Sequence, residues 1–207
     1  MKITVELNVL IALRLISGED EAKLSLFHTL HVEVTPEKEV IFVASDGRRL
    51  VAILAGKLDD PPPDKTFCAT FAIESGLLDK LIPQKGYHMV GMELSDGRVR
   101  IFALGITYEI PILKIEFPNW RSVLQLSNTI APAHGRAALN LYLFGSVLQC
   151  AEIISNGNTG GMRLWQNSSL EPMRIEFTTT PNLIAILMPM KIDVPERDTL
   201  ELPEWAN

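Results

Sequence analysis

The side chains best suited to metal binding or proton transfer in this sequence are its four histidines, His28, His31, His88 and His134. In a strand, side chains alternate between the two faces, so His28 and His31 would point to opposite sides, whereas His31 and Glu33 could share one. A zinc site needs three or four converging ligands. We therefore predict that the histidines are polar strand or turn residues and that the chain has no metal site.

Other patterns that support catalysis are missing as well. Cys68 and Cys150 are too few for a disulfide framework and lack the spacing of metal ligands, which is typical of a protein in a reducing cytosol. The sequence contains no G-x-S-x-G, H-E-x-x-H or Walker-type glycine motif. Residues 157–161 are rich in glycine, but no strand-to-helix junction follows to bind phosphate, so we predict a hairpin loop. We expect no catalytic residue, no cofactor and no enzyme; a hydrolase that uses the histidines is the least favoured alternative.

Composition is ordinary for a globular protein of one or two domains. The chain has 207 residues, of which 47% are hydrophobic and 21% charged, and its formal net charge is −6. An acidic balance argues against a protein that coats nucleic acid by bulk charge, although local basic contacts stay open. The first residues lack the layout of a signal peptide, and no apolar run approaches the ~18 residues of a membrane span. We expect a cytoplasmic protein without membrane contact.

The elements that would position these residues recur along the chain. Helical patterns cover residues 7–17, 74–82 and 141–154, so their starts are 67 residues apart twice (74 − 7 and 141 − 74). Each follows a short apolar segment and precedes three predicted strands. The predicted first strands are 3–5, 67–73 and 137–141; the others are 24–34, 40–44, 49–54, 88–94, 99–104, 107–115, 162–165, 173–178 and 183–192.

The repeating unit is strand–helix–strand–strand–strand, present three times. Asp-Gly pairs at 46–47 and 96–97 predict tight hairpins. Linkers are expected at 57–65 and 127–135, and 193–207 would be an extended tail. Each unit would place one helix on one face of an antiparallel sheet, which is an α+β arrangement.

Three ordered segments point to a known family. They are Ser45-Asp46-Gly47-Arg48-Arg49-Leu50, Phe117-Pro118-Asn119-Trp120-Arg121-Ser122-Val123-Leu124 and Ile186-Leu187-Met188-Pro189-Met190-Lys191-Ile192. Together they resemble the T-D-G-H/R-R-L, F-P-D/N-Y/W-R and M-P-M-R/K-L/I segments of the bacterial sliding clamp, the DNA polymerase III beta subunit. The resemblance implies the DNA-clamp fold. Residues 1–126 are similar to a whole clamp domain built from units 1–60 and 65–126, and residues 135–192 to half of another domain.

What this resemblance implies is a non-enzymatic DNA replication processivity factor. Family members form rings around double-stranded DNA and bind DNA polymerase and other proteins through short peptides such as Q-L-S/D-L-F, which dock in an apolar cleft. The cleft residues expected here are Leu26, Ser45, Gly47, Arg48, Arg49, Leu50, Pro118, Val123, Ile186, Met188, Pro189 and Met190.

DNA contacts would be weak in such a ring. The expected DNA-facing cations are Arg14, Lys80 and Lys85, whereas Glu19, Asp20 and Glu21 would repel phosphate. The alternative function is a regulatory or decoy protein that binds clamp partners, or the clamp itself, without encircling DNA.

The odd number of units predicts association between chains. The third unit lacks a partner unit, so its sheet edge and the apolar side of helix 141–154 would stay open unless another chain covers them. We therefore predict a homo-oligomer, at least a dimer, that joins third units about a two-fold axis through residues 135–192.

Overall fold

The computed structural model describes residues 1–17, 29–73, 89–95, 97–103, 105–126, 138–158, 160–166, 168 and 170–190. Its helices are α1 (Leu7–Ser17), α3 (Trp120–Leu126) and α4 (Leu141–Ile154). Its strands are β1 (Lys2–Glu6), β2 (Leu30–Val34), β3 (Val40–Ser45), β4 (Arg49–Leu54), β5 (Lys57–Leu58), β6 (Phe67–Phe71), β7 (Met89–Ser95), β8 (Arg98–Ala103), β9 (Ile106–Pro111), β10 (Met162–Trp165), β11 (Met173–Phe177) and β12 (Leu183–Leu187).

Two antiparallel sheets hold these strands. One has five strands in the order β5-β1-β7-β8-β9, and the other has seven in the order β10-β11-β12-β4-β3-β2-β6. The first two units exchange their first strands: β1 pairs with β7 of the second unit, and β6 of the second unit pairs with β2 of the first. Neither unit therefore completes its own sheet, and the two fold as one body.

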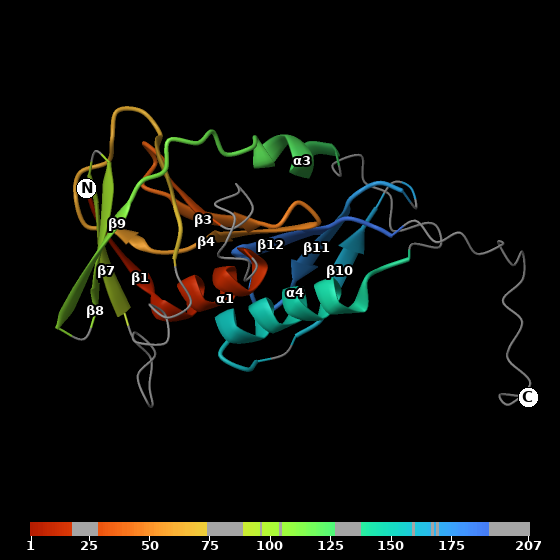
Figure 1. Cartoon of the computed structure of the whole chain (residues 1–207). Helices are drawn as coiled ribbons and strands as arrows, with labels where there is room; N and C mark the ends of the chain where they lie inside the picture. Colours follow the sequence, from red (N-terminus) through yellow and green to blue (C-terminus); the bar gives the residue numbers. More distant parts are fainter. Residues whose placement is uncertain are drawn as a thin grey trace, which may run out of the picture.

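Helices α1 and α4 lie side by side on one face of the seven-stranded sheet, and α3 lies on the opposite face (Figure 1). Helix α1 is apolar on nearly all sides because it is packed between the sheet and α4, and Leu10, Leu13 and Ile16 are fully buried. Helix α4 begins where the Asn140 side chain accepts hydrogen bonds from the backbone N–H groups of Tyr142 and Leu143. None of the described helices is long and apolar enough to span a membrane.

The sequence-based elements agree with the structure in the local features. The helices predicted at 7–17 and 141–154 have those bounds, and Gly47, with a φ of 82°, turns the chain between β3 and β4. The helix predicted at 74–82, the linker at 127–135 and the tail at 193–207 lie outside the described residues.

Four local expectations were wrong. Residues 157–161 are not a hairpin loop, because they connect helix α4 to strand β10 rather than two strands. The linker expected at 57–65 begins with strand β5, which pairs with β1. The strand predicted at 137–141 is reduced to one bridge between Ala138 and Met190, because Asn140 already starts α4. Helix α3, which lies in the F-P-N-W-R segment, was not predicted. It starts directly after Asn119, whose backbone carbonyl accepts a hydrogen bond from the Ser122 N–H at 3.1 Å.

We expected the third unit to have no partner within its own chain. This was wrong for one edge of its sheet and one side of its helix, which the first unit covers. Strand β12 pairs with β4 along its whole length, from Leu183 opposite Ile53 to Leu187 opposite Arg49. Helix α4 packs against α1, and the Asn8 amide donates to the carbonyl of Ile153 at 3.3 Å and to the side chain of Asn156 at 2.9 Å. The first unit therefore covers one edge of the third. The seven-stranded sheet crosses the predicted domain division near residues 126–135, and that division stays a prediction.

Candidate functional site

The candidate site lies on the outer face of the seven-stranded sheet, the face that carries α3. Its floor is the junction between β4 and β12, where Leu50 and Ile186 are opposite one another. These two residues are 8% and 2% exposed, and they form an apolar cluster with Val43, Ala52 and Trp120. The floor is thus built from segments that are far apart in the sequence.

A cavity of about 250 Å³ opens above this floor. It is bounded by the turn between β3 and β4, by the chain around α3, and by the end of β12. Its lining residues are Ser45, Gly47, Arg48, Arg49, Leu50, Phe117, Pro118, Trp120, Val123, Ile186 and Met188. The three segments that the sequence singled out therefore enclose one cavity.

The turn beside the cavity is held by its own side chains. The Asp46 carboxylate accepts hydrogen bonds from the backbone N–H groups of Arg48 and Arg49, both at 2.9 Å. The Ser45 hydroxyl donates to the Arg49 carbonyl at 2.9 Å and accepts from the Gly47 N–H at 3.1 Å. These contacts fix the turn as a rigid rim, and Arg48 is exposed on it.

Arg49 has other partners than a docked peptide. Its Nε atom donates to the Asp46 carboxylate at 2.9 Å, and its Nη2 atom donates to the Leu15 carbonyl of α1 at 3.0 Å. The guanidinium also lies 6.0 Å from the centre of the Tyr142 ring of α4. Because Leu15 and Tyr142 belong to the helix layer, the Arg49 side chain connects the turn to the helices. Arg48 is therefore the better placed cation at the cavity.

The wall on the α3 side is anchored by Glu33 of β2. The Trp120 indole N–H donates to Glu33 Oε1 at 2.8 Å, and Arg121 forms an ion pair with Glu33 Oε2 at 2.6 Å. The Arg121 guanidinium also lies 4.2 Å from the Trp120 ring centre. Nearby, the Phe117 ring stacks on His31 with centroids 4.5 Å apart. A seven-residue helix is too short to be stable alone, so these contacts hold it in place.

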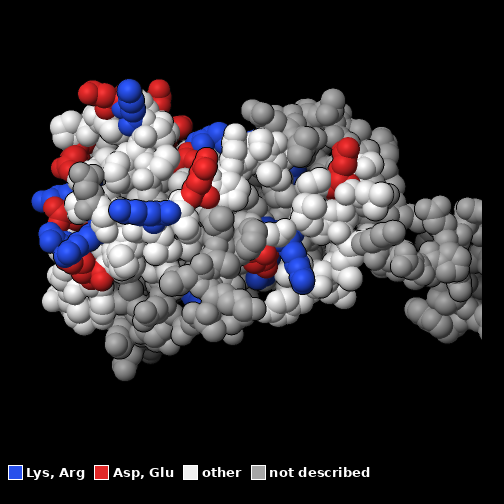
Figure 2. All heavy atoms as spheres, turned by 45° about the horizontal axis from the view of Figure 1, so that its top comes forward, with Lys and Arg blue, Asp and Glu red and all other residues white. Residues whose placement is uncertain are grey.

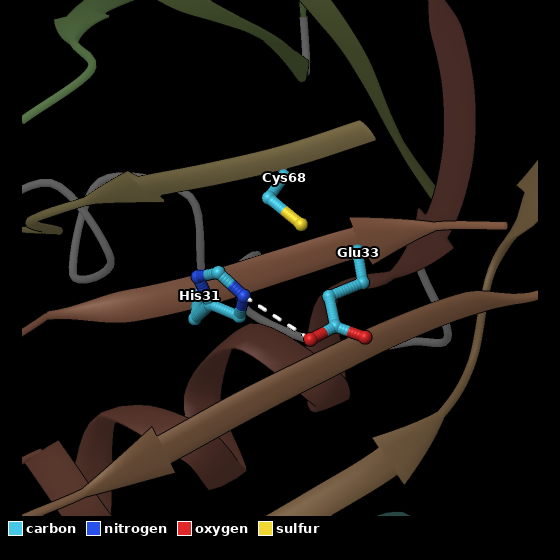
Figure 3. Close-up of side chains that lie close together, drawn as sticks. All are labelled: His31, Glu33 and Cys68. Atoms are coloured by element: carbon cyan, nitrogen blue, oxygen red, sulfur yellow. Dashed lines mark ion pairs between the residues drawn. The ribbon is translucent and has the colours of Figure 1, made fainter. Parts of the chain in front are cut away.

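His31, Glu33 and Cys68 lie close together on β2 and β6, next to this wall (Figure 3). One ligand atom from each lies within 4.8 Å of the others, and His31 Nε2 is 3.3 Å from Glu33 Oε1. These three atoms could coordinate a zinc ion only if the Glu33 carboxylate were free to act as a ligand. Because Glu33 already accepts from Trp120 and pairs with the Arg121 cation, we interpret the cluster as structural; the absence of a metal stays a prediction.

The charge of Glu33 is stabilised despite its burial. Burial alone would raise the pKa of this carboxyl, but the hydrogen bonds from His31, Trp120 and Arg121 outweigh it and lower the pKa to about 2. Partial burial and the Glu33 charge raise the pKa of the Cys68 thiol. Glu33 is therefore an anionic anchor over the whole physiological pH range.

Of the twelve predicted cleft residues, nine line the cavity: Ser45, Gly47, Arg48, Arg49, Leu50, Pro118, Val123, Ile186 and Met188. Pro189 and Met190 follow β12 outside it, and Met190 pairs with Ala138 instead. Leu26 lies outside the described residues. Phe117 and Trp120 also line the cavity but were not among the predicted site residues; as aromatic residues of the same quoted segment as Pro118, they could have been recognised.

The described helix layer offers few cations for DNA. Arg14 is the single charged residue of α1, and Glu152 is the single charged residue of α4. Lys80, Lys85 and the acidic residues Glu19, Asp20 and Glu21 lie outside the described part of the chain. Figure 2 brings the α3 side of the molecule forward, and on that face acidic and basic residues are interspersed among uncharged ones. The described residues thus provide no continuous basic surface on that face.

No protein-family model matches the sequence, and no curated protein matches it. Solved structures do. A sliding clamp from Pseudomonas aeruginosa with a ligand matches with a TM-score of 0.65 and 15% sequence identity, and a clamp from the same organism bound to griselimycin matches with a TM-score of 0.66 and 14% identity. A clamp from Bacillus subtilis has 0.65 at 13%. Each similarity covers 93% of this chain, and it covers 66%, 66% and 64% of those chains.

At these identities the similarity concerns the fold, and the chain spans about two thirds of the length of the clamps that it matches. The chain therefore has the α+β fold of the bacterial DNA polymerase III beta sliding clamps.

Proposed function

We propose that this chain is a non-enzymatic, clamp-like tether that holds partner proteins through a short peptide bound in the cavity beside α3. The observation that carries the proposal is the enclosure of one cavity by three segments that are distant in sequence, at the junction of β4 and β12. Proteins that are matched only in fold can differ in activity, so the argument rests on the site itself.

The shape and lining of the cavity suit an apolar peptide. Leu50 and Ile186 form a buried floor, while Val123 and Met188 remain partly exposed at the sides. A cavity of about 250 Å³ accommodates one or two apolar side chains rather than a large cofactor. Methionine adapts its shape to different neighbours, so Met188, which is 40% exposed, suits a site that accepts several partners.

Polar groups at the rim would orient the bound peptide. Arg48 is exposed beside the cavity and has no ion-pair partner among the described residues. It could pair with an acidic or amide side chain next to the apolar anchors of the peptide. The rigid turn around Gly47 presents backbone groups at the same edge of the cavity. Apolar contacts would therefore supply most of the affinity, and the polar groups of the rim would fix the position and direction of the bound peptide.

The similarity to the clamp fold supports a wider proposal. We propose a DNA replication processivity factor that acts in the cytoplasm, binds DNA polymerase or similar proteins, and forms a homo-oligomer. With Arg14 as the single cation of the two described long helices, direct contacts to double-stranded DNA would be weak, and retention would depend on topology.

The cavity is tested by fluorescence anisotropy with a labelled Q-L-S-L-F-type peptide. We expect saturable binding by the wild-type protein and at least a ~10-fold increase in Kd for Met188→Glu. Met89→Glu is the matched control, because Met89 is also exposed but lies on β7 in the other sheet. Absence of saturable binding at high micromolar concentrations of folded protein would overturn the proposal, and so would equal losses in both variants.

The DNA role is tested separately by retention on nicked circular DNA and on the same DNA after linearisation, with a clamp loader if needed. Retention that is lost on linearisation supports encirclement. Peptide binding without any retention on the circle would instead assign the chain to a regulatory or decoy role.

A further inference from the structure

Strand β10 is the terminal strand of the seven-stranded sheet. Its four residues pair with β11 on one side, from Met162 opposite Phe177 to Trp165 opposite Arg174, and no described strand pairs with its other side. The backbone groups on that side are therefore available to another strand. Met162 is 42% exposed at the beginning of β10.

Helix α4, which packs on β12 of the same sheet, carries exposed apolar side chains. Residues Leu141, Phe144 and Leu148 recur at the spacing that places them on one flank of the helix. Leu141 is 83% exposed and Leu148 is 37% exposed, while Phe144 is partly buried against the core. The side of α4 that contacts α1 is instead marked by the Ile153 carbonyl, which accepts a hydrogen bond from Asn8 of α1. The exposed apolar flank is thus distinct from the α1 contact.

The other two units show what covers such an edge. In the first unit the strand after the helix is β2, and its outer side is paired with β6, the first strand of the second unit. In the second unit the equivalent strand is β7, which is paired with β1, the first strand of the first unit. In the third unit the equivalent strand is β10. By the same rule, β10 would receive the first strand of a partner unit.

Among the described residues, no further unit lies beside the third one to supply that strand. The third unit also has its own unused first-strand segment, residues 138–140, which makes only the Ala138–Met190 bridge. One third unit therefore offers both an open edge and a strand that could cover such an edge.

We propose that a second copy of this chain covers β10 and the Leu141–Phe144–Leu148 flank of α4, so that two third units form one composite domain about a two-fold axis. Such an interface is self-complementary: the segment at 138–140 of each copy pairs with β10 of the other, and the two α4 flanks pack together. This inference specifies the homo-oligomer of the proposed function, and it does not require the peptide cavity to bind anything.

The experiment is gel filtration with light scattering at micromolar concentrations of the full chain. We expect a mass about twice the 23.0 kDa of one chain. Leu148→Lys and Met162→Lys, at exposed positions of the interface, should each weaken dimerisation by at least ~10-fold. Leu54→Lys is the matched control, because Leu54 is 45% exposed at the end of the fully paired strand β4. Circular dichroism verifies that each variant is folded.

A wild-type monomer at all these concentrations would overturn the inference, because the open edge would then be covered within the chain or stay uncovered. A dimer that resists both Leu148→Lys and Met162→Lys, or that is equally lost in Leu54→Lys, would place the interface elsewhere. Peptide anisotropy on the same samples separates the two proposals: a monomer that binds the peptide contradicts only the dimer, and a dimer that does not bind it contradicts only the cleft.

Discussion

Leu50 of β4 and Ile186 of β12 are register partners across the strand pair that joins the first and third units. The same two residues form the floor of the candidate cavity. The structural junction and the candidate binding site are therefore one feature. A peptide bound on this floor would contact both units, so its binding energy would also stabilise their pairing.

Truncating this floor should cost stability. We expect Ile186→Ala to lower the free energy of unfolding by about 2–4 kcal/mol, because Ile186 is 2% exposed and its removal leaves a cavity under the junction. Ile184→Ala is the control on the same strand, since Ile184 is only partly buried and should cost about 1 kcal/mol or less. Urea unfolding at pH 7 measures both; equal losses would show that the floor is not a close-packed part of the core.

The indole N–H of Trp120 should matter more than that of Trp165. Trp120→Phe removes the hydrogen bond to the buried Glu33 carboxylate and should cost about 1–3 kcal/mol of unfolding free energy. In contrast, Trp165 Nε1 is buried without a hydrogen-bond partner among the described residues, so Trp165→Phe should be close to neutral. Thermal and urea unfolding of both variants compare them. A larger loss for Trp165→Phe would contradict the assignment of Glu33 as the anchor of α3.

Glu33 should make stability depend on pH. Its pKa of about 2 in the folded state lies below the ordinary value of 4.5, so the unfolded chain binds its proton first as the pH falls. The stabilisation is present above about pH 4.5, and it decreases as the pH falls toward 2. Its full size is on the order of 3 kcal/mol.

This pH dependence is measured by comparing wild type with Glu33→Gln in urea at several pH values. We expect the difference between the two proteins to be largest near pH 7 and to shrink steadily below about pH 4.5. A difference that stays constant from pH 7 to pH 3 would contradict a strongly ionised Glu33.

The two thiols should react at very different rates. Cys150 is buried in α4 and its burial raises its pKa to about 12, so it should react with a thiol reagent only when the protein unfolds. Cys68 is exposed and should react in the native state, but more slowly than a free thiol, because partial burial and the Glu33 charge raise its pKa. Titration with Ellman's reagent should show one accessible thiol, and Cys68→Ser should abolish it. Two rapidly reacting thiols in the native protein would contradict the packing of α4 against the sheet.

Local chemistry allowed several elements to be predicted from the sequence. Helices α1 and α4 have the predicted bounds, because an apolar periodicity begins and ends at residues that can be recognised, such as Asn140 before α4. The turn at Asp46-Gly47 was also predictable, since glycine readily adopts the positive φ that this hairpin needs. The three segments that surround the cavity could be recognised by their resemblance to a family, without knowledge of how they meet.

The pairing of β12 with β4, the exchange of first strands, and the anchoring of α3 were decided by tertiary structure alone. Strand periodicity shows which side chains share a face, but it does not show which distant strand lies alongside. For the same reason Glu33 was considered as a partner of His31 alone, although it also binds Trp120 and Arg121 across the sheet surface. The sequence determined most of the elements and nine of the eleven residues that line the cavity, whereas long-range strand pairing decided that these residues meet at the junction of two units.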